Sequence, residues 1–73
     1  MSRGIPTAVT MTERGRSLVE EGRVQEGIDQ FTKALALDSS YTLALEARAA
    51  AYELQSRHAE AEQDRRQLDA AGA

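Results

Sequence analysis

Residues 22–28 read Gly-Arg-Val-Gln-Glu-Gly-Ile, and a shift of 34 residues lays this stretch over a related one. The same offset aligns identical or similar residues along most of the chain. A fixed period of this size indicates stacked units of two helices each. Such units present a groove to another chain and seldom carry chemistry, so the period predicts recognition and not catalysis. The aligned pairs are Arg14 with Arg48, Gly15 with Ala49, Leu18 with Tyr52, Arg23 with Arg57, Glu26 with Glu60, Gly27 with Ala61 and Ala36 with Ala70.

Length and composition narrow the class of protein. Seventy-three residues correspond to one small domain, which buries only roughly 60% of its unfolded surface. Cysteine is absent, which excludes disulfides, thiolate metal sites and thiol nucleophiles. The net charge of −3 argues against a nucleic-acid-binding protein, which would carry a basic stripe. No apolar run is long enough to span a membrane, and the N-terminus lacks a signal-peptide core, so we expect a cytoplasmic protein.

The hydrophobic pattern predicts an all-α chain. Val24, Ile28, Phe31 and Leu35 step by four, three and four residues, which places them on one helix face. No alternating strand pattern occurs, and the only proline is Pro6. Short connections should make successive helices antiparallel neighbours. We expect a flexible N-terminal arm over 1–7 and one domain over 8–73, with repeat one at 8–41, repeat two at 42–73, and four helices at 8–21, 24–37, 42–55 and 58–71.

Residues with known positional preferences mark the expected helix ends. Thr7 is a candidate cap for the first helix, and Thr10 with Glu13 forms an alternative capping box. Gly22 suits the left-handed position that ends a helix. Residues 38–40, Asp-Ser-Ser, offer capping side chains for the third helix.

Large and small residues alternate along both units in one arrangement. The first unit supplies Met11, Gly15, Leu18, Gly27, Phe31 and Ala34, and the second supplies Leu45, Ala49, Tyr52 and Ala61. This arrangement resembles the tetratricopeptide repeat (TPR), in which small residues let paired helices approach. The resemblance implies two tandem antiparallel helix-turn-helix repeats, an α-solenoid whose first helices line a concave groove. The chain departs from the motif at Arg14 and Arg48, which replace large apolar residues, at Ser39, which replaces the usual proline, and at Arg65, which replaces an aromatic residue.

Two structural alternatives remain open from the residues alone. An ordinary four-helix bundle is also rich in alanine and leucine, but it needs no common offset between its helix pairs. The recurring Arg14 and Arg48 either cover a helix interface with their stems or pair with Glu26 and Glu60, which share the period.

The fourth helix is more polar than the second at equivalent positions. Under the 34-residue offset, Ile28 becomes Glu62, Phe31 becomes Arg65 and Leu35 becomes Asp69. Terminal repeats need a polar outer face to stay soluble, so we expect this helix to cap a protein complete at two repeats. A charged face bound by a partner is the alternative.

The TPR resemblance implies a function and a site. We expect a non-catalytic protein–protein interaction module, acting as an adaptor, accessory subunit or small chaperone. It would bind a peptide or helix of a partner in its concave groove. A partner helix with a basic rim suits this mixed surface of apolar spots and acidic edges. The expected groove residues are Val9, Thr12, Arg16 and Val19 from the first repeat and Leu43, Glu46, Ala50 and Glu53 from the second.

A second hypothesis is structural: a self-associating unit that forms a homo-oligomer through its groove and N-terminal arm. No catalytic site, cofactor or metal is expected. His58 is the only histidine, and a metal site needs several convergent ligands. The acidic residues are interpreted as solvated charge on helix faces, because general acid–base work needs a cleft that shifts their pKa values.

Overall fold

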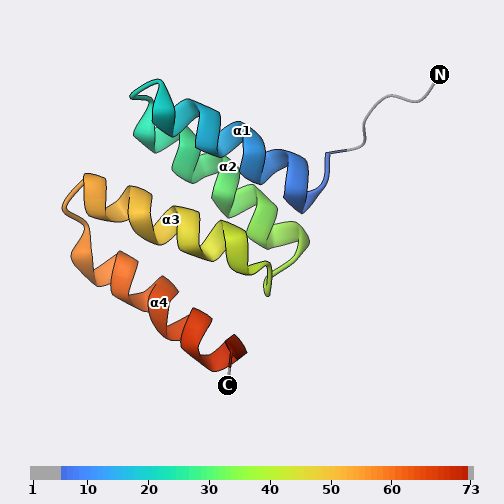
Figure 1. Cartoon of the computed structure of the whole chain (residues 1–73), viewed down its shortest axis with the longest axis vertical. Coiled ribbons are helices and arrows are strands. Elements are labelled where there is room, and N and C mark those ends of the chain that lie inside the picture. Colours follow the sequence, from blue (N-terminus) through green and yellow to red (C-terminus); the bar gives the residue numbers. More distant parts are fainter. Residues whose placement is uncertain (1–5, 73) are drawn as a thin grey trace.

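A computed structural model describes residues 6–72, and within them helix is the only regular secondary structure. The four helices are α1 (Ala8–Glu20), α2 (Val24–Leu37), α3 (Thr42–Leu54) and α4 (His58–Gly72). Figure 1 shows them side by side in chain order, each reversing the direction of the one before. The expected arm over 1–7 falls largely outside the described residues, and the described part begins just before α1.

The helices pair as two consecutive hairpins. Helix α1 packs on α2 and α3 packs on α4, while α2 joins the hairpins by packing on α3, and α1 also touches α3. Within the described residues, α4 has no such contact with α1 or α2. A closed four-helix bundle would bring the first and last helices together. The fold is therefore an open row of two tandem antiparallel hairpins, as the sequence predicts.

The turns of the two hairpins each place a residue at positive φ. Gly22 follows α1 with φ of +86°, and Ser56, one period later, follows α3 with φ of +58°. Both residues occupy the left-handed region that ends many helices, where glycine is the favoured residue. The turn at Ser56 is therefore strained relative to its copy, because a serine has a Cβ that this region disfavours.

The hydrogen bonds of these turns also repeat. The N–H of Gly22 donates to the carbonyl of Val19 at 2.9 Å, and the N–H of Arg23 donates to that of Leu18 at 2.8 Å. This pair of bonds is a Schellman motif, which satisfies carbonyls left free at a helix end. The second hairpin makes the same two bonds at the same distances, from Ser56 to Glu53 and from Arg57 to Tyr52.

An arginine immediately before the second helix of each hairpin forms an ion pair with a glutamate three residues later. Arg23 donates to Glu26 from Nε at 2.7 Å and from an Nη at 2.6 Å. Arg57 binds Glu60 in the same two-pronged way, at 2.8 and 2.6 Å. Of the two alternatives for Arg14 and Arg48, pairing with these glutamates is therefore wrong. The residue three positions before each glutamate reaches it within one helix turn.

Arg48 instead crosses to the fourth helix. Its Nε and one Nη donate to the two carboxylate oxygens of Asp64 at 2.8 and 2.7 Å, and its other Nη donates to Thr32 at 3.2 Å. The Asp64 side chain is 3% exposed, so this is a buried ion pair between α3 and α4. The position one period before Asp64 is Gln30, which carries no charge. Arg14 accordingly lies exposed on α1.

Small residues bring the helices of each hairpin together. Gly15 of α1 and Gly27 of α2 are both buried, and a Cβ added to Gly27 would lie 2.7 Å from the carbonyl oxygen of Gly15. The second hairpin has the buried Ala49 and Ala61 at these positions. The first crossing therefore depends on the absence of side chains, whereas the second accommodates methyl groups.

The core lies between α2 and α3. Phe31 and Leu45 are the largest fully buried side chains, and Ile28 and Ala51 are also buried. Ile28, Phe31 and Ala51 form one cluster, against which partly buried residues pack. These partly buried residues are Val19, Val24, Ala47 and Tyr52. This cluster joins the first hairpin to the second, because it combines residues of α2 and α3.

The helix bounds agree with the expected ones to within one residue. The alternative caps of α1 are resolved in favour of Thr7, whose hydroxyl accepts from the N–H of Thr10 at 3.2 Å, while Thr10 Oγ1 accepts from the N–H of Thr7 at 2.9 Å. The expectation that residues 38–40 cap α3 is wrong. Tyr41 is the N-cap and makes no side-chain capping bond. Asp38 instead accepts from the N–H of Ser40 at 3.1 Å within the turn.

Candidate partner-binding groove

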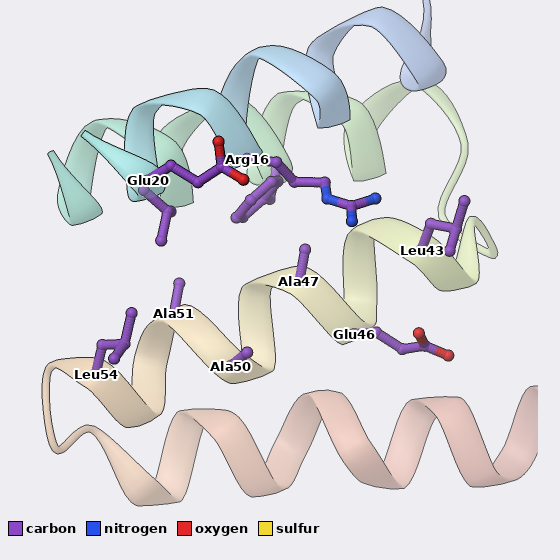
Figure 2. A pocket seen from close by; sticks show the side chains of 10 residues that line it. Arg16, Glu20, Leu43, Glu46, Ala47, Ala50, Ala51 and Leu54 are labelled. Carbon is purple, nitrogen blue, oxygen red and sulfur yellow. The ribbon is translucent and has the colours of Figure 1, made fainter. Parts of the chain in front are cut away.

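A hollow of about 360 Å³ lies between α1 and α3, the first helices of the two hairpins. Figure 2 shows it from close by, with Leu43 and Leu54 at opposite ends of α3 and alanines on the turns between them. Phe31 of α2 also lines it, although this residue is only 1% exposed. The remaining residues that line it are Arg16, Val19 and Glu20 from α1 and Glu46, Ala47, Ala50 and Ala51 from α3.

The hollow exists because α3 carries alanine where its neighbours approach. Ala47 and Ala51 face the gap between the ribbons of α1 and α3 in Figure 2. A methyl group in place of a larger chain leaves space beside Val19 and Phe31 that no atom of the described residues fills. Two exposed leucines close the ends, with Leu43 at 47% and Leu54 at 66% exposure. Large exposed apolar side chains beside a hollow are a common mark of an interaction site.

The rim of the groove is charged. Arg16 extends along α1 toward the end occupied by Leu43, and Glu46 lies on the opposite side of that end (Figure 2). Glu20 lies one turn after Arg16 on α1. Over residues 6–72, no ion pair involves any of these three side chains. Their charges are therefore open to groups from outside the chain.

Of the eight residues expected in the groove, five line the hollow. They are Arg16, Val19, Leu43, Glu46 and Ala50. Two helices that are distant in sequence bring these five together, because α1 and α3 lie beside each other with α2 between them in the chain.

The other three expected residues lie elsewhere. Val9 is 48% exposed on the first turn of α1, away from the hollow. Thr12 is 2% exposed, and its hydroxyl donates to the carbonyl of Ala8 at 2.7 Å. Glu53 points to α4, where it accepts from Arg65 at 2.6 Å and contacts His58. These hydrogen bonds occupy the polar atoms of Thr12 and Glu53 within the chain.

Five further residues line the hollow that were not expected from the sequence: Glu20, Phe31, Ala47, Ala51 and Leu54. Glu20, Ala47 and Leu54 had a usable signal, since each lies four residues after an expected groove residue and so on the same helix face. Ala51 is buried and belongs to the core cluster as well as lining the hollow. Phe31 had no signal, because it belongs to the second helix of its hairpin.

The strongly paired acids lie outside the groove. The pKa of Glu53 is lowered from 4.5, first by the hydrogen bond from Arg65 and then by that from His58. Arg57 lowers the pKa of Glu60, and Arg23 lowers that of Glu26, in each case mainly through side-chain hydrogen bonds. The lowered pKa values mean that these hydrogen bonds stabilise the charged form of each carboxylate. Over the part of the chain that the structure describes, no three potential metal ligands gather at one place.

Comparison of the chain with protein-family models, with curated proteins and with solved structures finds no match. None of the described helices is both long enough and apolar enough to cross a membrane.

Proposed function

We propose that this protein is a non-catalytic interaction module that holds a segment of a partner protein in the groove between α1 and α3. The observation that carries the proposal is the hollow itself, lined by apolar groups and rimmed by unpaired charges. The resemblance to TPR motifs supports the same conclusion, since the period and the small residues recur at the turn and crossing positions. In this role the protein is an adaptor, an accessory subunit or a small chaperone.

The size of the molecule favours a short partner segment. The whole described surface is 4830 Å², and a standard interface takes about 800 Å² from each partner. A groove of two hairpins supplies only part of that area. A single helix or peptide is a better match for it than a folded domain, which needs a broad flat contact. A helix that lies in a groove makes most of its contact through one apolar face.

Site-specific crosslinking in the native host tests the proposal. A photoreactive residue replaces Ala50, which lines the hollow, or Ala36, which is exposed on α2 outside it. We expect a discrete crosslinked partner from position 50 and none from position 36. Leu43→Glu, at an exposed position of the groove, should remove the crosslink while leaving the helical circular dichroism unchanged. Equal products from both positions, or none from position 50, would contradict the proposal.

Self-association is the second outcome that this experiment separates. A crosslink from position 50 to another copy of the same chain would identify the groove as a homo-oligomer interface. Light scattering on the purified protein then measures the mass directly. A monomer at micromolar concentration supports the adaptor, and a stable dimer supports the structural unit.

A further inference from the structure

We propose that the groove is built for an amphipathic helix of about three turns that places one bulky apolar side chain into the hollow and basic side chains on either flank. This inference rests on the proposed function and specifies the chemistry of the partner. Three features of the structure support it: the shape of the hollow, the spacing of its ends and the signs of its rim charges.

The hollow has room for a large side chain. Its volume of about 360 Å³ is at the lower end of the range of ligand pockets. Its floor consists of Phe31, Ala51 and Ala47, with Val19 on the α1 side, so every floor group is apolar. Phe31 and Ala51 are each 1% exposed and belong to the core cluster, which makes the floor rigid. An aromatic or leucine side chain would exclude water from this floor, as the central anchors of protein interfaces do.

The spacing of the ends fits three helical turns. Leu43 and Leu54 are eleven residues apart on α3, which corresponds to roughly 16 Å along the helix axis. A partner helix of about eleven residues spans the same distance. It would contact both leucines at its ends while its anchor lies between them over Ala50. The small methyl group of Ala50 permits the close approach of axes that helix packing requires.

The rim charges favour basic flanks on the partner. Two carboxylates, Glu20 and Glu46, and one guanidinium, Arg16, line the hollow. Elsewhere on α3 and α4 the arginines already hold acidic partners, as Arg48 holds Asp64 and Arg65 holds Glu53. Glu46 is the clearest case of an open charge, because its neighbours one turn away on α3 are Thr42 and Ala50. A lysine or arginine one turn from the anchor would meet a carboxylate on either side of the hollow.

Defined synthetic peptides test the inference. The parent probe is a lactam-stapled, alanine-rich helix of fourteen residues with one central tryptophan and lysines three and four positions to each side. One matched probe has glutamates in place of the lysines, and another has alanine in place of the tryptophan. Affinity is measured by fluorescence anisotropy, and the site is mapped by amide chemical-shift changes in the isotopically labelled full chain.

We expect the parent probe to bind with shifts centred on Val19, Ala47, Ala50 and Ala51. The glutamate probe should bind about tenfold more weakly, since attraction to two carboxylates becomes repulsion. The alanine probe should bind about thirtyfold more weakly, as expected when an interface anchor is removed. Glu46→Lys should reverse the preference between the lysine and glutamate probes. Ala50→Leu, which fills the hollow, should weaken the parent probe at least tenfold, while the control Ala36→Leu leaves it unchanged.

Other results would overturn the inference. Equal affinity of the lysine and glutamate probes contradicts the basic flanks, and equal affinity with and without tryptophan contradicts the anchor. Shifts outside the groove, or no binding of any probe at millimolar concentration, contradict the inference as a whole. The proposed function is decided separately, because crosslinking from position 50 detects a partner of any chemistry. If position 50 crosslinks to a partner but the probes bind with equal affinity, the amphipathic basic helix is rejected as the partner and the proposed function stands.

Discussion

A Cβ added to Gly15 would lie 2.7 Å from Cδ1 of Phe31, so the ring of Phe31 occupies the space that a side chain at position 15 would need. The ring in turn forms part of the floor of the groove and of the core cluster. The residue one period after Phe31 is Arg65, which is exposed, and the residue one period after Gly15 is Ala49. The glycine and the aromatic ring are therefore coupled in the first hairpin, and both are replaced together in the second.

Overpacking in Gly15→Ala should cost about 1–3 kcal/mol, which leaves a net destabilisation of up to about 2 kcal/mol once the helix propensity of alanine is counted. The added methyl group overpacks the crossing against the ring and against the carbonyl of Gly27, 2.9 Å away. The gain of about 1 kcal/mol that alanine brings to a helix interior offsets part of this cost. Urea denaturation followed by circular dichroism measures the change. The matched variant Ala49→Gly should lose only about 1 kcal/mol, and a Gly15→Ala protein as stable as the parent would show that the crossing can widen freely.

Ser56→Gly should stabilise the protein by about 0.5–1 kcal/mol. Ser56 has a φ of +58°, and relieving a left-handed conformation at a residue with a Cβ is worth about 1–2 kcal/mol before the entropy of glycine in the unfolded chain is subtracted. The reverse change in the other hairpin, Gly22→Ser, should destabilise it by a similar amount. Nothing lies within 4 Å of a Cβ at Gly22, so the effect there comes from the backbone alone. Thermal melts of both variants check the opposite signs.

Asp64→Ala should cost about 3 kcal/mol. It removes the acceptor of two hydrogen bonds and leaves the Arg48 guanidinium, 18% exposed, without its counter-charge between α3 and α4. Asp69→Ala, at an exposed position on the same helix, is the control and should change stability by less than about 0.5 kcal/mol. The largest effect that we expect is unfolding of the Asp64→Ala protein at 25 °C, seen as loss of the helical circular dichroism signal, while the Asp69→Ala protein stays folded. A change equal to that of the control would show that the ion pair adds nothing to the stack.

Stability should fall as the solution is acidified below pH 4.5. Folding lowers the pKa values of Glu26, Glu53 and Glu60 from 4.5, so the unfolded chain binds more protons than the folded one in this range. The stabilisation is complete above pH 4.5 and is lost as the pH falls through the lowered values. Urea midpoints between pH 7 and pH 3 measure it.

A single substitution assigns part of this pH dependence to one ion pair. Glu60→Gln keeps the shape of the side chain but removes the charge that Arg57 holds, so its midpoint should depend less steeply on pH below 4.5. Glu13→Gln, at an exposed position outside these pairs, controls for the loss of one negative charge. Parallel curves for the parent and the Glu60→Gln protein would show that this pair does not contribute.

The sequence features that predicted the helices involve residues close together along the chain. Apolar spacing over α2 and the left-handed preference of Gly22 depend on neighbours within one or two turns, and the structure has the helices within one residue of the expected bounds. The caps of α3 were predicted less well. Residues 38–40 have the right side chains, but Asp38 uses its carboxylate to close the turn, where it accepts from both the N–H and the hydroxyl of Ser40.

The groove was predicted in part. The rotation of each helix about its axis decides which of the expected residues line it. The first helices of the hairpins were expected to line it, and both do. A small rotation decides whether a residue at the edge of that face points into the groove, as Leu54 does, or across to α4, as Glu53 does. The burial of Thr12 depends in the same way on how closely α1 approaches its neighbours.

The sequence by itself determined the period, the helical class, the hairpin order and the turn at Gly22, because each of these depends on signals between residues close along the chain or repeated at one offset. Only the tertiary structure decided that Arg48 binds Asp64 instead of Glu60, and that Phe31 forms the floor of the groove. A long charged side chain can reach several acids at similar sequence distances, and which one it meets depends on the spacing and rotation of whole helices. Those quantities are set by the packing of all four helices together.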